Sequence, residues 1–275
     1  EITFGPPEWP KLYLLVAVPN GKSPVACFVG PNFNGNHVLT EHERVRIPTA
    51  WVPGSGPGVE KGTNKATAAG RGKQADTWPL QEVIRQGYGG ATFYCGDVQP
   101  DRPDADEGMR KTLPKLAGKT PPDETATIAW WAWGCHRAVD YLVTDSDIDA
   151  KRLAVVGHSR LGKTALLAGA FDDRIAVVIP HQSGCGGAGP SRSKNEKAET
   201  VKRITTAFPH WVADAKVTLN GIAIEPLGSA LVSIDTDPSN IRLTASGRVR
   251  IRLPAPFIGP VTLYEGSIDR TLVQT

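Results

Sequence analysis

The segment from Arg152 to Lys163 constrains the fold more than any other part of the chain. Its first half ends in Val155 and Val156, and this apolar run predicts a buried strand. Gly157 then permits a sharp turn, and residues 161–170 have the composition of a helix. A strand that passes directly into a helix is the unit from which parallel sheets are built, so the segment predicts an α/β protein.

Predicted strands and helices alternate along the chain up to about residue 214. The strands are apolar, β-prone runs, whereas the helices carry apolar residues at helical spacing. This alternation predicts a mostly parallel sheet with helices on both faces, which is a three-layer α/β sandwich. The predicted strands are residues 12–18, 25–29, 90–94 and 175–179, the predicted helices are residues 78–86 and 127–143, and the predicted long loops are residues 53–73 and 98–124.

The character of the sequence changes after about residue 214. Tryptophan disappears, and short β-prone runs are separated by Asn-Gly, Asp-Pro, Ser-Gly and Gly-Pro turns. Val249, Ile251 and Leu253 alternate with arginines, which is the period of a half-exposed antiparallel strand. We therefore predict an α/β domain over residues 1–214 and a short β-rich C-terminal segment over residues 215–275, whose role the sequence does not indicate.

Composition argues against several classes of function. The net charge of +3 is small and spread over 275 residues, so we expect no nucleic-acid partner and no membrane partner. The short basic run at residues 192–197 is expected to be a solvated loop. Residues 145–149 contain three aspartates but lack the glycine and glutamate of a calcium-binding loop, so we expect a capped turn there.

The cysteines do not have the spacing of a metal site. Cys27 and Cys95 adjoin predicted core strands and are expected to be buried thiols. Cys135 is on a predicted helix and Cys185 is in a predicted loop, and a disulfide between them stays open for a secreted protein. We expect neither a metal nor a cofactor.

Ser159 lies where the predicted strand turns into the predicted helix. A serine at this point presents its hydroxyl at the end of the sheet, as in the nucleophile elbow of α/β-hydrolases. The usual elbow has the pattern G-x-S-x-G, but here the second glycine comes one position later, at Gly162. A helix-capping serine would not require both Gly157 and Gly162, so we interpret Ser159 as a nucleophile.

The run from Gly157 to Lys163 resembles the serine motif G-x-S-R-x-G-K of the glucuronoyl esterases, which are carbohydrate esterase family 15. Ser183–Gly187 and Phe208–Trp211 are similar to the bacterial branch of that family. The resemblance extends over about residues 1–214 and includes residues 28–37, 87–97, 129–149 and 179–211. Residues 215–275 do not resemble the C-terminal part of the family.

This resemblance implies an α/β-hydrolase fold and a serine esterase that needs only side chains for its chemistry. The implied substrate is a cell-wall carbohydrate ester, namely a 4-O-methyl-glucuronoyl ester that joins xylan to lignin alcohols, cleaved through an acyl-enzyme. Acetyl and simple alkyl esters stay open as substrates. We expect a monomer that is secreted or periplasmic, because its polysaccharide substrate lies outside the cell.

The resemblance also implies roles for residues around the serine. Arg160 would stabilise the oxyanion with its backbone N–H and its guanidinium, and a second donor could come from residues 32–36. Lys163 and Glu199 would bind sugar hydroxyls, and Trp211 would form an apolar wall against the sugar. The alternatives are a surface arginine, a solvated lysine and a core tryptophan.

Two members of the catalytic triad lack a counterpart in the expected places. The acid of fungal relatives falls at Gln182, which carries no charge and is kept only as a substrate-binding candidate. The base of this fold follows the last strand, but no histidine lies after His210. His181, at the end of the neighbouring strand, is the best substitute base, followed by His37, whereas His158 should point away from the serine.

Three interpretations follow from this pattern. The chain is an active carbohydrate esterase, a non-catalytic carbohydrate-binding relative that lacks the triad histidine, or a chimera with a foreign tail. In each case the last strands of the family are missing, which should expose one sheet edge and some apolar surface. We therefore predict either that residues 215–275 pair onto that edge or that the protein is poorly stable.

Overall fold

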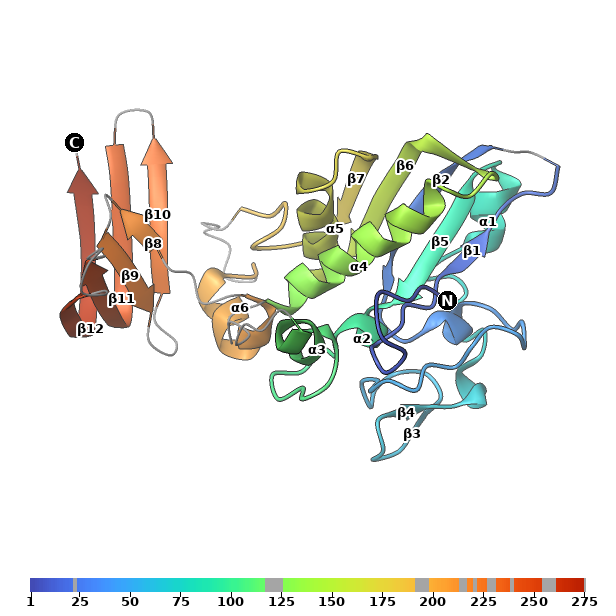
Figure 1. Cartoon of the computed structure of the whole chain (residues 1–275), viewed down its shortest axis with the longest axis horizontal. Coiled ribbons are helices and arrows are strands. Elements are labelled where there is room, and N and C mark those ends of the chain that lie inside the picture. The colour runs from blue at the N-terminus through green and yellow to red at the C-terminus, as the bar shows by residue number, and fades with distance from the viewer. Residues whose placement is uncertain are drawn as a thin grey trace. The chain divides into compact units, whose positions relative to one another are not determined.

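The computed structural model divides the chain into two compact units, Glu1–Val201 and Lys202–Thr275 (Figure 1). The structure describes the backbone of all residues except 22–23, 117–125, 191–197, 213–216, 220–221, 227–230, 238–239, 254–260 and 275. Side chains are described up to residue 212, apart from these gaps and residues 113–116. The units divide at residues 201–202, whereas the predicted boundary at residue 214 rests on the sequence pattern and stays a prediction.

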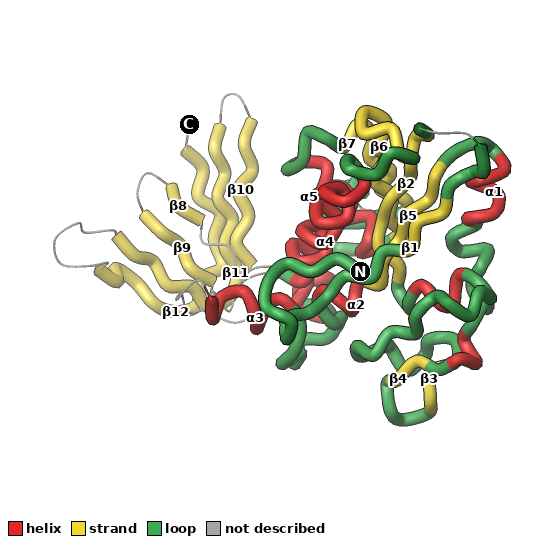
Figure 2. The backbone as a smooth tube through the Cα atoms, turned by 45° about the vertical axis from the view of Figure 1, so that its right-hand side comes forward, coloured by secondary structure: helices red, strands yellow, loops and turns green. Residues whose placement is uncertain are grey.

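A five-stranded sheet forms the centre of the first unit (Figure 2). Its strand order is β1-β5-β2-β6-β7, with β1 antiparallel to β5 and all other neighbours parallel. The strands are β1 (Leu15–Ala17), β2 (Val25–Asn32), β5 (Gly89–Tyr94), β6 (Ile148–His158) and β7 (Ile175–His181). The predicted mostly parallel sheet is therefore confirmed.

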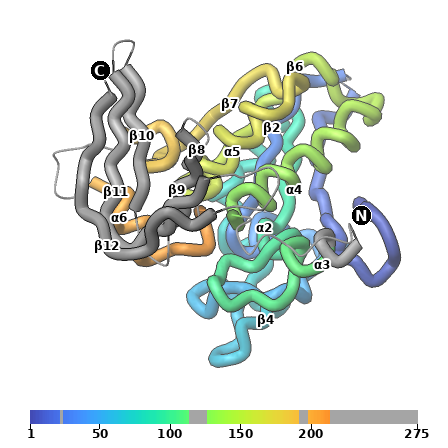
Figure 3. The backbone as a smooth tube through the Cα atoms, turned by 60° about the vertical axis from the view of Figure 1, so that its left-hand side comes forward, coloured from blue at the N-terminus to red at the C-terminus, as the bar shows by residue number. Residues whose placement is uncertain are grey.

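Helices cover both faces of this sheet. The helices α4 (Thr127–Leu142) and α5 (Arg160–Ala170) lie side by side on one face (Figure 3). Phe93 of β5 packs against α4, where a Cβ at Gly134 would lie 3.1 Å from its ring. Gly90 of the same strand approaches Leu80 of α1 (Leu80–Arg85), and residues three apart on a strand face opposite sides. The predicted three-layer arrangement is thus present.

The elements between the strands are short. In the predicted loops lie the two-stranded ribbon β3 (Val59–Glu60) and β4 (Lys65–Ala66), the 3-10 helix η2 (Ala68–Gly70) and the helix α3 (Met109–Leu116). The 3-10 helix η1 (Asn36–Leu39) follows β2, and the single-turn helix α2 (Cys95–Val98) follows β5.

The last strand of the sheet, β7, has an exposed face. Val177 is 52 % exposed and Ile179 is 37 % exposed, although both are large and apolar. Val178 faces the other way, because a Cβ at Gly169 of α5 would collide with it. A parallel sheet normally has both faces covered, so β7 is the least protected strand of this unit.

The second unit is β-rich, in line with the sequence pattern of residues 215–275. Its elements are α6 (Val201–Ala207), which starts at the last residue of the first unit, η3 (Pro209–Trp211), β8 (Val217–Leu219), β9 (Ile222–Pro226), β10 (Leu231–Asp237), β11 (Asn240–Leu253) and β12 (Val261–Gln274). The strands form an antiparallel sheet of order β10-β11-β9-β8, with β12 paired to β11. Within the described backbone these strands pair with one another, and the predicted pairing of residues 215–275 onto the edge of the first sheet stays a prediction.

The four cysteines are free thiols, and all four are buried. The disulfide left open between Cys135 and Cys185 is therefore not formed. Burial raises the pKa of Cys27 and Cys135 to about 12, and raises that of Cys95 above its ordinary value. None of the described helices combines the length and the apolar character that crossing a membrane requires.

Candidate active site

Ser159 occupies a strained turn between β6 and α5. Its backbone has φ 57° and ψ −125°, a conformation that non-glycine residues rarely adopt outside functional sites. The turn is fixed from both sides, because the Ser159 N–H donates to the carbonyl of His181 at 2.9 Å and the Gly162 N–H donates to the carbonyl of Ser159 at 2.9 Å. The predicted elbow is therefore present in its geometry.

The two glycines of the motif are required by close packing. A Cβ at Gly157 would lie 2.0 Å from the carbonyl oxygen of Leu161, which leaves no space for any side chain. A Cβ at Gly162 would lie 2.9 Å from Cβ of Ser183, in the segment that follows β7. The second glycine therefore lies one position later than usual, where α5 crosses this segment.

Arg160 begins α5 and lies between two neighbours. Its Nε is 2.6 Å from Oδ2 of Asp101, and its guanidinium carbon is 4.6 Å from the centre of the Phe33 ring. The Arg160 side chain is 25 % exposed and that of Asp101 is 12 % exposed. Arg160 is therefore an anchored residue beside the elbow and not a free surface arginine.

Lys163 is buried, contrary to the alternative of a solvated helix lysine. Its side chain is 4 % exposed, and its ammonium donates to Oε2 of Glu199 at 2.7 Å. The same ammonium also donates to the backbone carbonyl of Ser183. Gly184, with φ 63°, allows this pair, because a Cβ there would lie 2.3 Å from the same carboxylate oxygen. The structure thus brings two of the predicted sugar-binding residues together, and their role toward a sugar stays a prediction.

The structure places His181 beside His158. The two residues are register partners on β7 and β6, and their Nδ1 atoms are 3.2 Å apart. Both rings line an apolar cavity of about 300 Å³ on the sheet face opposite α4 and α5. Burial, followed by the charges of His181 and Arg160, lowers the pKa of His158. Within the described side chains no hydrogen bond joins the Ser159 hydroxyl to a histidine ring, so the serine–base pair predicted with His181 is not assembled.

The settings of the other three candidates differ. His37 is fully buried, and burial, followed by the charge of Arg71, lowers its pKa. Gln182 is exposed, with a φ of 46°. Trp211 belongs to the second unit, where it is 4 % exposed and stacks on Phe208 at 3.8 Å between ring centres, which favours the alternative of a core tryptophan.

Polar groups of the loop at residues 32–36 already form hydrogen bonds within the protein. The Asn32 amide donates to Asn36 at 2.7 Å and to Thr92 at 3.1 Å, and its carbonyl oxygen accepts the Gly35 N–H at 2.8 Å. The Gly35 N–H, one of the amides that could have served as a second oxyanion donor, is thus already bonded within the loop.

Sequence reasoning did not single out the carboxyl groups of Asp101 and Asp97. Asp101 pairs with Arg160, and the only signal for it was its place in a charged, proline-rich loop. Asp97, in α2, is partly buried, and burial raises its pKa to about 7. Across the described residues, no cluster of three or more histidine, cysteine, aspartate or glutamate side chains could hold a metal ion.

Comparison with known proteins agrees with this geometry. The family model described as "Glucuronyl esterase, fungi" matches residues 119–220. The carbohydrate esterase MZ0003, from an unknown prokaryotic organism, is 44 % identical over 215 residues, which are 77 % of this chain and 49 % of that protein. The matched part of the chain belongs to carbohydrate esterase family 15, the glucuronoyl esterases.

Solved glucuronoyl esterase structures support the same assignment. A promiscuous family 15 esterase from a marine bacterial metagenome superposes with a TM-score of 0.67 at 44 % identity, covering 76 % of this chain and 52 % of the other. The glucuronoyl esterase of Solibacter usitatus gives a TM-score of 0.64 at 34 % identity with the same coverage. The chain spans about half the length of these family 15 relatives.

A fungal relative of the same family adds a substrate name. A 4-O-methyl-glucuronoyl methylesterase of Neurospora crassa is 50 % identical over 80 residues, which are 28 % of this chain and 20 % of that protein.

Proposed function

We propose that this chain is a serine carbohydrate esterase that cleaves 4-O-methyl-glucuronoyl esters through an acyl-enzyme on Ser159. The observation that carries the proposal is the strained elbow at Ser159, with Arg160 held beside it. Strain at a serine between a strand and a helix is characteristic of a nucleophile. The printed names of the relatives, carbohydrate esterase and 4-O-methyl-glucuronoyl methylesterase, supply the substrate class.

The described groups suit the steps of ester cleavage. The Ser159 hydroxyl would attack the ester carbonyl, and the backbone N–H and guanidinium of Arg160 would stabilise the oxyanion that forms. The alcohol would leave with a proton, and water would then release the glucuronate from the serine. Lys163 and Glu199, fixed as a pair one helical turn beyond the serine, would contact the sugar. An enzyme of this kind would act on cell-wall material, so we propose export to the periplasm or the exterior.

One observation favours a second candidate, a carbohydrate-binding relative without turnover. The hydroxyl of Ser159 needs a base, but the His181 ring lies against His158 and not against the serine. Removing the base of a serine triad lowers the rate by several orders of magnitude. The two candidates therefore predict very different rates for the same site.

Hydrolysis of a benzyl glucuronate ester and of p-nitrophenyl acetate would separate them. We expect turnover in the natural chain, loss of that turnover in Ser159→Ala, and no loss in Ser55→Ala, a matched change in an exposed loop. A His181→Ala variant would then show whether this histidine moves to act as the base. Equal rates for the natural chain and Ser159→Ala would overturn the esterase proposal. Binding of a glucuronoxylan oligosaccharide by the same proteins would then support the second candidate.

A further inference from the structure

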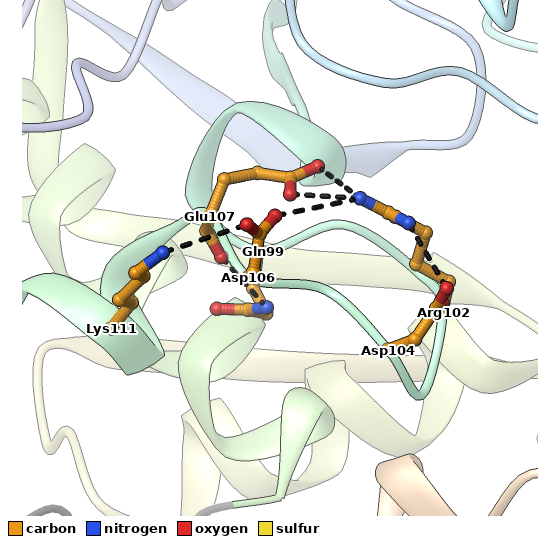
Figure 4. A network of polar contacts seen from close by, with 6 residues as sticks. All are labelled: Gln99, Arg102, Asp104, Asp106, Glu107 and Lys111. Carbon is orange, nitrogen blue, oxygen red and sulfur yellow. Dashed lines mark hydrogen bonds and ion pairs between the residues drawn. The ribbon is translucent and has the colours of Figure 1, made fainter.

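The loop between α2 and α3 is anchored at its first residue, Gln99. This side chain is fully buried, and its backbone carbonyl accepts the indole N–H of Trp131 at 2.8 Å. Its Oε1 accepts the Arg110 N–H at 3.0 Å. Its Nε2 donates to the carbonyl of Glu107 at 3.3 Å (Figure 4). The backbone and side chain of this one residue therefore join α4, the start of α3 and the end of the loop.

A second anchor lies three residues further along the chain, at Arg102. Its guanidinium pairs with Glu107 at 2.8 Å and with Asp104 at 3.3 Å, while Asp106 lies 3.9 Å away and also pairs with Lys111 at 3.6 Å (Figure 4). A network of several charges holds its members better than an isolated surface pair does. The ion pairs of Arg102 thus hold the two ends of the loop together.

Asp101 lies between these two anchors and faces the elbow. Its carboxylate is 12 % exposed and lies 2.6 Å from Nε of Arg160. The ring of Phe33 supports the same guanidinium from another direction, at 4.6 Å. The ion pair at Nε and the ring beside the guanidinium carbon together restrict where this guanidinium can lie.

We propose that Asp101 is the positioning residue that holds the guanidinium of Arg160 in place beside Ser159. The inference rests on the proposed esterase function, in which Arg160 meets the oxyanion. Asp101 acts through Arg160 and does not touch the ester.

The negative charge of Asp101 makes it possible to distinguish a positioning role from a direct electrostatic effect on the oxyanion. A carboxylate next to Arg160 lowers the positive potential available to an oxyanion. If the charge of Asp101 mattered alone, its neutralisation would therefore speed the reaction. If Asp101 positions Arg160, its neutralisation slows the reaction, because a misplaced donor no longer meets the transition state.

The test compares Asp101→Asn with a matched control, Asp149→Asn. Asp149 pairs through Oδ2 with Nε of Arg152 at 2.6 Å, at the opposite end of β6. The distance equals that between Asp101 and Arg160, but this pair is more exposed and here Nε donates a hydrogen bond to Oδ2. We expect Asp101→Asn to lower kcat on the benzyl glucuronate ester about tenfold with KM within twofold, since the backbone N–H donor remains. Asp149→Asn should leave both constants unchanged, and Asp101→Glu should recover part of kcat. A kcat for Asp101→Asn equal to or above that of the natural chain would overturn the proposal.

A second readout does not depend on turnover. In protein labelled with ¹⁵N-arginine, the Nε–H signal of Arg160 is assigned by its loss in Arg160→Lys. This signal should be protected from exchange in the natural chain and in Asp149→Asn, and it should shift and exchange faster in Asp101→Asn. If no protein exceeds Ser159→Ala in rate, the esterase function fails, and this signal alone decides whether Asp101 holds the guanidinium. An unchanged Arg160 signal in a folded Asp101→Asn protein would refute the positioning.

Discussion

The ion pair between Lys163 and Glu199 should make Glu199→Gln destabilising well beyond an ordinary surface change. The Lys163 side chain is 4 % exposed and that of Glu199 is 28 % exposed. Removing one member of a fully buried pair costs about 3–5 kcal/mol, because the remaining charge has no compensation. Lys163 keeps the carbonyl of Ser183, and Glu199 is partly solvated, so we expect a loss of about 2 kcal/mol in the free energy of unfolding.

Urea unfolding followed by tryptophan fluorescence would measure this loss in the first unit. Six of the seven tryptophans lie before residue 202, so the signal reports mainly on that unit. With an m-value of about 2–3 kcal/mol/M, the midpoint should fall by about 0.7–1 M. The matched control is Glu82→Gln, which neutralises a carboxylate in the exposed pair with Arg85, and it should leave the midpoint unchanged.

A double-mutant cycle tests the physical reason. In a Lys163→Met background no ammonium is buried, so adding Glu199→Gln should cost almost nothing further. A midpoint drop from Glu199→Gln that is as small as in the exposed control would refute the argument from burial. An equally large drop in the Lys163→Met background would show that Glu199 stabilises the fold by contacts other than this pair.

Three further outcomes follow from the same structure. Gly157→Ala should yield no folded protein with an intact elbow, because the new Cβ would lie 2.0 Å from the Leu161 carbonyl oxygen; a normal circular dichroism spectrum and melting temperature would contradict this. Burial raises the pKa of Asp97 to about 7, so between about pH 4 and pH 7 the native state binds more protons than the unfolded state. Stability should therefore fall as pH rises through this window, by at most about 1.4 kcal/mol per pH unit, and Asp97→Asn should remove the decline; the same difference in urea midpoint between pH 5 and pH 8 in both proteins would refute the assignment. The buried thiols of Cys95 and Cys135 should react with a thiol reagent only after urea is added, and fast labelling of the native protein would show that this core opens.

The local elements of the first unit could be predicted because their signals are local. An apolar run, a glycine and a helical pattern between Arg152 and Lys163 are enough to define β6, the turn and α5. The alternation of such units then predicts a mostly parallel sheet, since consecutive parallel strands need a crossover between them.

The contacts of the site could not be predicted in the same way, because they join distant segments. Asp101 and Arg160 are 59 positions apart, and Lys163 and Glu199 are 36 positions apart. Neither carboxylate has a spacing that points to its partner. His181 was predicted at the correct edge of the sheet, but its ring packs on His158 because parallel strands place register partners on the same face.

The exposed face of β7 is connected to the lack of a hydrogen bond between the Ser159 hydroxyl and a histidine ring. Val177, Ile179 and His181 alternate along β7 and therefore point to the same side of the sheet. His181 contacts His158, which directly precedes Ser159, and its carbonyl accepts the Ser159 N–H. Any element that covered the apolar residues of β7 would extend to the rings of these histidines and change their environment beside the serine. Protection of β7 from hydrogen exchange and the rate of the Ser159 reaction should therefore respond together to whatever covers this face.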